Sequence, residues 1–225
     1  MKKIGLIVFV FALSIGLAFS TSCSFGSFSN MSGVQGSGTS KSETRNVSGF
    51  TKIDTGGAIN VEVAVQKDFS VVVEADDNLL TNIKTEVSGD TLKIYSEDRI
   101  SSKTRINVVI SMPALEGLDV SGASSGNVAN VNADSLELKA SGASKIKIDG
   151  TAKQLNADAS GASTIEAENL KVADADVEAS GASKATVAAT NDLKVDASGA
   201  SKISYVGEPK SVKQNSSGAS SVTKK

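Results

Sequence analysis

The stretch Val177-Glu178-Ala179-Ser180-Gly181-Ala182-Ser183-Lys184-Ala185 contains the unit that decides the fold, because Ser-Gly-Ala-Ser recurs through the second half of the chain. Six copies begin at Ser121, Ser141, Ser160, Ser180, Ser198 and Ser217. Their spacings are 20, 19, 20, 18 and 19 residues, and a unit of about 19 residues is too short for a pair of helices with its turns. The regular spacing therefore predicts stacked coils of β-strand, an all-β solenoid or β-helix.

Apolar and polar residues alternate around each copy. Two apolar columns precede it: Leu118, Leu138, Ala157, Val177, Val195 and Gln214, then Val120, Ala140, Ala159, Ala179, Ala197 and Ser216. A third column follows it: Ile146, Ile165, Ala185, Ile203 and Val222. Between the first two lies a column that is charged in all but the last copy: Asp119, Lys139, Asp158, Glu178, Asp196 and Asn215. This period of two predicts strands that turn the apolar columns inward and the charged column outward.

Each Ser-Gly-Ala-Ser unit lies between two apolar runs, which predicts a corner of the coil. Glycine adopts a positive φ without steric penalty, so one glycine in each coil can bend the chain at the same angular position. These corner residues are Gly122, Gly142, Gly161, Gly181, Gly199 and Gly218. The period does not decide whether the Ser and Ala side chains there point in or out. The usual handedness of connections between parallel strands predicts a right-handed solenoid.

The N-terminus has the features of a secretory signal. Two lysines precede an apolar run over residues 4–19, and Cys23, the single cysteine of the sequence, follows small residues. This arrangement resembles the lipobox of bacterial lipoproteins, in which the Cys becomes the lipidated N-terminus, although Ser20 replaces the usual Leu. We therefore expect a lipoprotein signal peptide over residues 1–22, lipidation at Cys23, and an extracytoplasmic chain anchored to a bacterial membrane, at the outer membrane or the cell surface.

Composition shifts divide the rest of the chain. Residues 23–44 are rich in Ser and Gly without periodicity, which is typical of a flexible tether. Residues 45–225 are expected to form one solenoid domain, with capping strands over 45–115 and the repeat coils over 116–225. The candidate capping strands are 50–54, 59–66, 69–75, 83–87, 91–95 and 106–112, and Ser88-Gly89-Asp90 is predicted to close a hairpin. This irregular, more antiparallel segment would cover an open edge of the coil stack.

Four runs in the capping segment form an ordered series. They are Phe50-Thr51-Lys52-Ile53, Gly57-Ala58-Ile59-Asn60-Val61-Glu62-Val63, Val71-Val72-Val73-Glu74-Ala75-Asp76-Asp77-Asn78-Leu79-Leu80 and Thr91-Leu92-Lys93-Ile94. Together with the later repeats, over residues 47–222, this series resembles the head GIN domain, a family of secreted bacterial domains. The GIN element carries an additional Ala58 between Gly57 and Ile59. The resemblance implies a β-helical extracytoplasmic domain with an adhesive role, and it supplies no catalytic residues.

Charge and aromatic content limit the partners. The sequence has 23 basic and 25 acidic residues, and removal of the signal would take away two lysines and no acidic residue, leaving 21 and 25, a net charge of −4. A net negative chain argues against a nucleic-acid partner. With 7 Phe, 2 Tyr and no Trp, the chain has few aromatic platforms for stacking, which weakens a shallow carbohydrate site without excluding it.

The sequence offers little for catalysis. Histidine is absent, which removes the Ser-His-Asp and Cys-His systems and the commonest zinc ligand. The neighbours Ser144-Lys145, Ser183-Lys184 and Ser201-Lys202 would point to opposite faces of a strand. Asp76-Asp77-Asn78 lacks the alternating ligands of a calcium loop. We expect no catalytic residue, no metal site and no cofactor.

Two charged columns form the candidate binding surface. One contains Asp119, Lys139, Asp158, Glu178 and Asp196, and the other contains Lys145, Lys184 and Lys202. A solvated face that keeps the rod soluble is the simpler interpretation, and an ionic docking surface for a glycan or a protein is the functional one. The sequence predicts a non-enzymatic, lipid-anchored, adhesin-like binding domain of the cell envelope. A polysaccharide-processing solenoid enzyme and a self-associating structural envelope protein stay open as alternatives, as does the oligomeric state.

Overall fold

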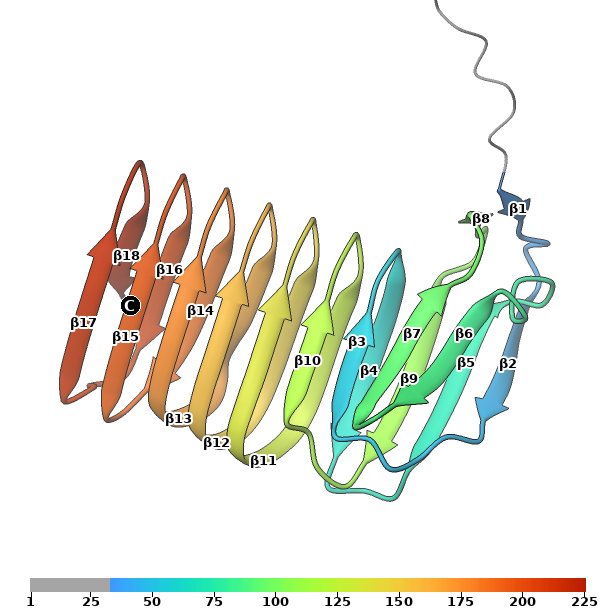
Figure 1. The fold of residues 1–225 in the computed structure, drawn as a ribbon, viewed down its shortest axis with the longest axis horizontal. Coiled ribbons are helices and arrows are strands. Elements are labelled where there is room, and N and C mark those ends of the chain that lie inside the picture. Colours follow the sequence, from blue (N-terminus) through green and yellow to red (C-terminus); the bar gives the residue numbers. More distant parts are fainter. Residues whose placement is uncertain (1–32) are drawn as a thin grey trace, which may run out of the picture. The chain divides into compact units, whose positions relative to one another are not determined.

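The computed structural model describes residues 33–225, which form a β-solenoid of stacked parallel coils without a helix (Figure 1). The expected signal peptide, Cys23 and the first part of the expected tether lie outside the described residues. No segment from residue 33 onward forms a helix long and apolar enough to cross a membrane.

The repeat half forms the regular part of the solenoid. Its strands are β10 (Gly117–Val120), β11 (Ser125–Ala140), β12 (Lys145–Ala159), β13 (Thr164–Ala179), β14 (Lys184–Ala189), β15 (Asp192–Ala197), β16 (Lys202–Val206), β17 (Ser211–Ser216) and β18 (Ser221–Lys224). Neighbouring strands pair in parallel, and each residue lies beside its equivalent one coil later, as Leu118 lies beside Leu138. The six corners enclose about 5 turns, which confirms the stacked-coil prediction.

Each coil is flattened into two layers that meet at the Ser-Gly-Ala-Ser corner (Figure 1). The ascending layer contains the strand segments that end at the corner: β10, the second halves of β11, β12 and β13, then β15 and β17. The descending layer contains the segments that begin after the corner: the first halves of β11, β12 and β13, then β14, β16 and β18. At the opposite end of the coil, irregularities in register such as that between Val128 and Val131 mark the bend that joins the layers.

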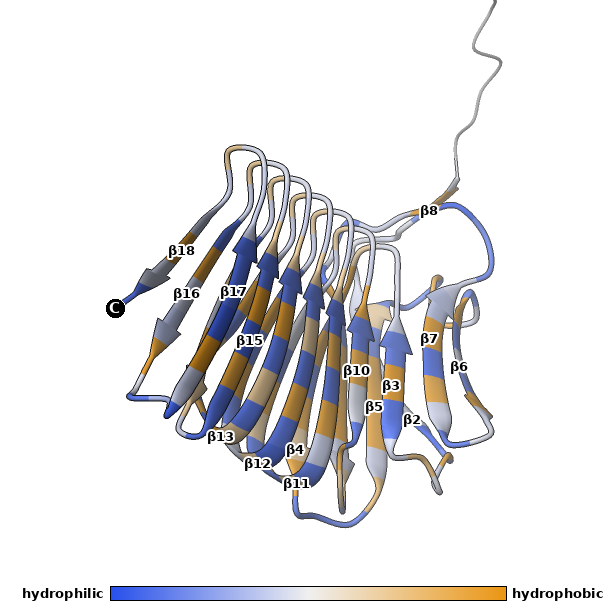
Figure 2. Cartoon of the chain, turned by 60° about the vertical axis from the view of Figure 1, so that its left-hand side comes forward, coloured by the Kyte–Doolittle hydropathy of each residue, from blue (hydrophilic) through white to orange (hydrophobic). Residues whose placement is uncertain are grey.

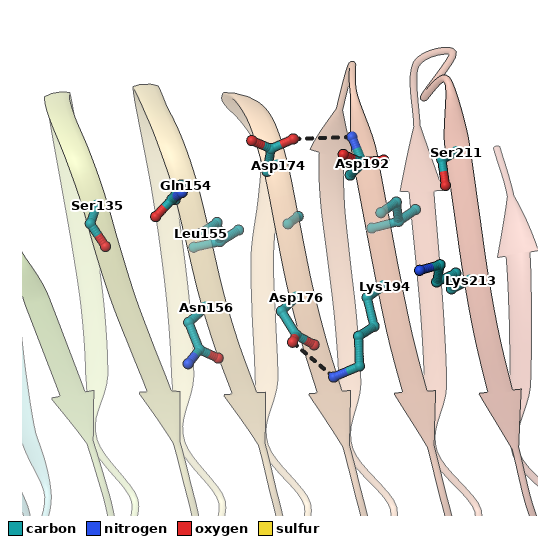
Figure 3. Close-up of a pocket in the computed structure, with 12 residues that line it drawn as sticks. Ser135, Gln154, Leu155, Asn156, Asp174, Asp176, Asp192, Lys194, Ser211 and Lys213 are labelled. Carbon is teal, nitrogen blue, oxygen red and sulfur yellow. Dashed lines mark hydrogen bonds and ion pairs between the residues drawn. The ribbon is translucent and has the colours of Figure 1, made fainter.

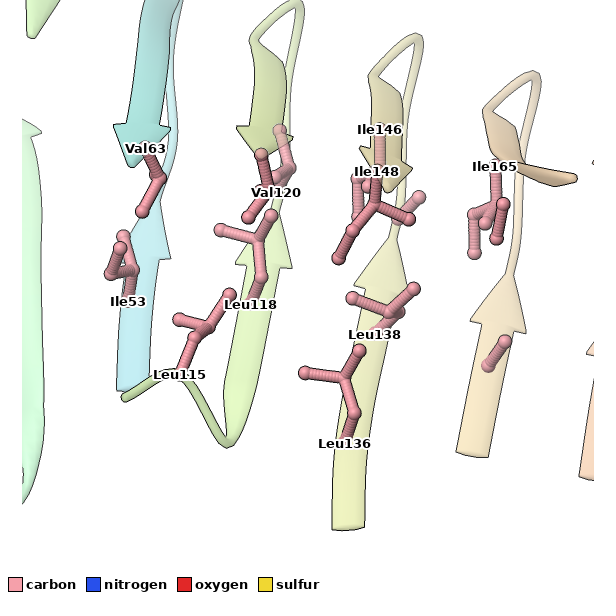
Figure 4. Packing of buried hydrophobic residues seen from close by; sticks show 14 of the residues in the cluster. Ile53, Val63, Leu115, Leu118, Val120, Leu136, Leu138, Ile146, Ile148 and Ile165 are labelled. Carbon is pink, nitrogen blue, oxygen red and sulfur yellow. The ribbon is translucent and has the colours of Figure 1, made fainter. Parts of the chain in front are cut away.

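The apolar columns fill the space between the layers, as the alternation predicts (Figure 4). From Leu118 to Val195 no member of the first column is more than 2% exposed, and Ile146 and Ile165 are fully buried on the descending layer. Along each strand, hydrophobic bands alternate with hydrophilic ones (Figure 2). In the last coil the inward positions are occupied by the exposed residues Gln214 and Ser216, so the apolar core ends before β17.

The capping segment continues the solenoid further than its sequence suggests. Its strands are β3 (Lys52–Thr55), β4 (Ile59–Val65), β5 (Ser70–Asp76), β6 (Ile83–Ser88), β7 (Thr91–Ser96) and β9 (Ile106–Met112). Strands β3 and β4 stack in parallel on β10 and β11, and β7 and β9 stack in parallel on the other side of β3 and β4. These two coils belong to the stack although they lack the Ser-Gly-Ala-Ser unit, and their order in space differs from their order in the chain.

Antiparallel strands cover the N-terminal end of the stack, as expected for a cap. Strand β5 pairs antiparallel with β9, and β6 pairs antiparallel with β7. Ser88 lies opposite Thr91, so Gly89 and Asp90 form the two-residue loop of the predicted hairpin.

Part of the segment expected to be a flexible tether is instead ordered on this cap. Strand β1 (Val34–Gln35) pairs with β8 (Ile100–Ser101), and β2 (Ser40–Arg45) pairs antiparallel with β5. The tether prediction is therefore wrong for these residues. Composition suggested a linker, but β5 offers a sheet edge whose backbone groups gain partners when β2 adds to it.

Candidate functional site

The acidic column lies on the outer face of the ascending layer. Asp119, Lys139, Asp158, Glu178 and Asp196 are direct neighbours in register along the stack. Lys139 pairs with Glu137 at 2.5 Å within its own strand. Asp158, Glu178 and Asp196 form no ion pair with any residue from 33 to 225. They are a run of three carboxylates, one coil apart, that we call the acidic stripe.

The column continues toward the cap as a like-charge pair. Asp119 lies beside Asp54 of β3. Partial burial, and then repulsion from the Asp54 carboxylate, raise the pKa of Asp119 above its usual value. Neighbouring carboxylates in a ladder therefore interact in this layer, although water screens the more exposed members.

The lysine column lies on the outer face of the descending layer. Lys145, Thr164, Lys184 and Lys202 are neighbours in register, and all three lysines are exposed. Lys145 pairs with Glu166 at 2.6 Å, whereas within the described chain Lys184 and Lys202 have no ion pair. Because the corner and the core separate the two layers, the lysines and the acidic stripe do not line one groove.

A shallow depression on the ascending layer holds further polar side chains (Figure 3). Asp174 accepts hydrogen bonds from Asn191 Nδ2 at 2.6 Å and from the Asp192 N–H at 3.2 Å. Lys194 Nζ pairs with Asp176 Oδ2 at 2.9 Å, and the Asp176 carboxylate raises the pKa of Lys194. These contacts across neighbouring coils pair most of the charged groups, although Asp176 Oδ1 is buried without a partner, so the depression offers few free charges to a ligand.

The Ser-Gly-Ala-Ser units lie at the corners, where their six glycines have φ between 71° and 73°. The Ala side chains point outward and the last Ser of each unit points into the core, which settles the question that the period left open. Ser163, Ser183 and Ser201 donate from Oγ to backbone carbonyls one coil earlier at 2.8 to 3.0 Å. In each Ser-Lys neighbour pair the Ser is buried and the Lys is exposed, so the two side chains do not form a nucleophile and base pair.

No group of three or more acidic or cysteine side chains between residues 33 and 225 is arranged to hold a metal ion.

A family model described as "Putative auto-transporter adhesin, head GIN domain" matches residues 49–209. The chain belongs to this head GIN domain family. The matched range includes most of the capping segment and the repeat coils up to β16, and it ends before β17. An adhesin-like family is typical of surface or extracytoplasmic proteins.

Solved structures share the fold of this chain at low sequence identity. A putative adhesin from Bacteroides fragilis is 20% identical with a TM-score of 0.70, over 85% of this chain and 99% of that one. A putative adhesin from Parabacteroides distasonis is 22% identical with a TM-score of 0.54, over 85% and 99% of the two chains. At these identities the likeness shows the fold alone. No curated protein matches the chain.

The head GIN fold also forms a pocket that sequence reasoning missed. The GIN element lies at the corner between β3 and β4, and Tyr95, Thr104 and Arg105 line a pocket beside it. Residues from two distant parts of the chain meet there because the coil of β7 and β9 stacks against the coil of β3 and β4. The resemblance marked the GIN element itself, but no local pattern marks Tyr95 or Arg105.

Proposed function

We propose that this head GIN domain is a non-enzymatic, lipid-anchored binding domain of the cell envelope that docks a basic protein surface on the acidic stripe. The stripe is the observation that carries the proposal. Three carboxylates repeat at the coil spacing, about 4.8 Å, on a regular face, and none of them forms an ion pair with a lysine or arginine among residues 33–225, although Lys139 lies beside Asp158 and Lys194 is near Glu178 and Asp196. Such a row complements a partner with clustered basic side chains and favours fast encounter with it.

The arrangement of the charged columns supports a binding role over polysaccharide cleavage. A glycosidase needs two carboxyl groups on either side of one bond, with one of them shifted in pKa to act as an acid. The acidic stripe is instead an open row, and the lysines lie on the other layer. The adhesin-like family agrees with this proposal.

Membrane attachment is the second part of the proposal, and it rests on the lipobox-like sequence at Cys23. A lipid at the N-terminus would hold the solenoid at a membrane while leaving its faces free. Replacement of Cys23 by Ala is expected to move the chain from the membrane fraction to the soluble fraction. Retention of the Cys23→Ala chain in the membrane fraction would contradict lipid anchoring.

Binding of a fragment spanning residues 24–225 to arrayed matrix proteins and glycans tests the docking face. The fragment contains all of the described residues, 33–225. One variant neutralises the stripe (Asp158→Asn, Glu178→Gln, Asp196→Asn), and a matched variant neutralises the other layer (Lys145→Gln, Lys184→Gln, Lys202→Gln). We expect binding to basic proteins that weakens with salt and is lost in the first variant alone. Loss in the lysine variant alone, or binding to neutral glycans that neither variant affects, would contradict the proposed face.

Self-association is a second candidate, favoured by the C-terminal end of the stack. Within the described chain β17 pairs only with β15 and β18 only with β16, so each has one free edge for another strand (Figure 1). A second copy adding there would give oligomers that grow with protein concentration. Sedimentation over a range of concentrations distinguishes the candidates: a monomer at all concentrations excludes self-association.

A further inference from the structure

A ladder of backbone hydrogen bonds runs along the corners and stops at Ala58. In every later corner the Ala N–H donates to the carbonyl of the corner glycine one coil earlier, at 2.7 to 2.8 Å, beginning with Ala123 to Gly57. Gly57 and Ala58 occupy the same place in the first corner as Gly122 and Ala123 do in the next one. The neighbouring coil has no glycine corner to receive it, because between β7 and β9 the chain leaves the stack through residues 97–105. Ala58 is exposed, and its N–H donates no hydrogen bond to a described residue; by the pattern of the row this N–H is directed toward the excursion.

A pocket lies where the ladder stops. Its walls are the GIN element from Gly57 to Asn60 and the chain on either side of the excursion, including Tyr95, Thr104 and Arg105. We call it the GIN-corner pocket. Its volume of about 620 Å³ is in the usual range of small-molecule sites, about 300 to 1,000 Å³.

Two side chains in its wall have hydrogen-bonding capacity that the protein does not use. Thr104 Oγ1 is buried in the pocket wall without a hydrogen-bond partner, an arrangement that costs stability, and a rotation of the Thr104 side chain would bring this hydroxyl to a ligand. The Arg105 guanidinium is exposed and has no ion pair with any carboxylate of the described chain. A backbone N–H, a hydroxyl and a guanidinium beside one cavity form a donor set suited to a carboxylate.

The remaining groups in the wall indicate what carries that carboxylate. The Tyr95 ring is 38% exposed, and its hydroxyl lies 3.3 Å from Glu86 Oε2, a hydrogen bond that fixes the ring at the edge of the pocket. An aromatic face of this kind packs against the C–H face of a sugar ring. Asp98, held by a 2.9 Å hydrogen bond from Asn82 Nδ2, supplies a carboxylate acceptor for hydroxyl groups. A sugar has such hydroxyls, whereas the acidic side chain of a peptide has none.

We propose that the GIN-corner pocket binds a carboxylate-bearing sugar of the uronic acid class, with Arg105, Thr104 Oγ1 and the Ala58 N–H receiving the carboxylate and Tyr95 stacking on the ring. The pocket lies apart from the acidic stripe, so this inference stands whether or not the stripe docks a protein.

Titration of the purified full chain with D-glucuronate, followed by NMR, tests the proposal, with D-glucose as the neutral probe. We expect a Kd for glucuronate on the order of 1 mM and binding of glucose at least about tenfold weaker. Arg105→Gln should weaken glucuronate binding by about tenfold or more, because hydrogen bonds to charged groups are the stronger class. Lys67→Gln, which removes a positive charge at the turn between β4 and β5, where Lys67 lines a different depression, is the matched control and should bind as the unmodified protein does.

Thr104→Val separates a ligand-binding role from a structural one. The substitution removes a buried hydroxyl that has no partner in the protein, so the melting temperature should stay equal or rise, while glucuronate binding weakens several-fold. Equal binding of glucose and glucuronate, unchanged binding by Arg105→Gln, or unchanged binding by Thr104→Val would overturn the proposal. Tighter binding of an N-acetylated aspartate peptide than of glucuronate would overturn the assignment to a sugar.

Discussion

Gly161 shows at the level of one residue why the corner requires its second position to be glycine. Its φ is 71°, and a Cβ added there would lie 2.8 Å from the carbonyl oxygen of Gly142 in the coil below. That oxygen accepts the Ala162 N–H at 2.7 Å, so it cannot withdraw without breaking the ladder. A side chain at residue 161 would therefore destabilise the fold in two independent ways, through strain in the left-handed backbone and through a clash with the neighbouring coil.

Substitution of Gly161 by Ala tests both costs against a matched control. Gly89 also has a positive φ, 64°, but nothing lies within 4 Å of the Cβ position there. Gly89→Ala should therefore lower the free energy of unfolding by about 1 kcal/mol, from backbone strain alone. Gly161→Ala should lower it by about 1 to 3 kcal/mol more, because overpacking adds to strain. Chemical denaturation measures both, and equal losses in the two variants would show that coil stacking adds nothing at the corner.

At the scale of single elements, Asp76 fastens the N-terminal strands to the cap. The residue is fully buried, and its carboxylate accepts hydrogen bonds from the Gly38 N–H at 2.6 Å, Ser102 Oγ at 2.6 Å and the Lys103 N–H at 2.8 Å. The Ser102 hydroxyl, helped by the backbone N–H groups, lowers the pKa of Asp76 to about 2, from 3.8. One carboxylate thus connects the segment before β2 with the segment after β8.

We predict that the stability contributed by the Asp76 carboxylate depends on pH. Because the folded-state pKa is lowered, the ionised group stabilises the fold above its unfolded pKa of 3.8, and this contribution disappears as the pH falls toward 2. Asp76→Asn should therefore melt at a lower temperature than the unmodified protein at pH 6, and the difference should shrink steadily below pH 4. Circular dichroism melts at a series of pH values measure it. A difference that is the same at pH 6 and pH 2.5 would contradict the assigned role of the charge.

The sequence predicted those strands and turns whose sequence pattern lies within a few neighbouring residues, and it missed those that depend on pairing between distant segments. Period-two alternation located the strand from Ile106 to Met112 to the residue, and Ser88-Gly89-Asp90 identified the hairpin between β6 and β7, because both signals lie within a few neighbouring residues. The pairing of β2 with β5 could not be seen, because Ser40–Arg45 is polar and its partner lies some thirty residues away. A tether and an exposed edge strand have similar compositions, and only the free edge of β5 distinguishes them.

For the whole molecule, the repeat predicted the stack but not the position of the cap coils within it. The coil of β7 and β9 lies outside that of β3 and β4, and this order follows from pairing between distant segments, which no local pattern encodes. The same limit applied to the candidate sites. The alternation showed that Asp158 and Lys184 point outward, but their separation onto two layers, and the meeting of Ala58 with Arg105, depend on how coils fold back and stack.

The two ends of the stack also differ, and the difference predicts a gradient of local stability. At the N-terminal end, antiparallel strands and a buried cluster that includes Phe50, whose ring centroid lies 5.0 Å from that of Phe69, close the core. At the C-terminal end, β17 and β18 have free outer edges, and Gln214 and Ser216 occupy inward positions without being buried. Little apolar burial therefore opposes the opening of the last coil.

Native-state hydrogen exchange measures this gradient directly. We expect the amides of β17 and β18 to exchange through local opening, at rates that denaturant hardly changes, while those of β12 and β13 exchange only on global unfolding. Gln214→Val is the informative variant, because an apolar side chain at this inward position continues the column that ends at Val195 and should slow exchange in β17 without altering β12. Uniform protection from β10 to β18 would instead show that the coils unfold as one unit and that the open end carries no separate weakness.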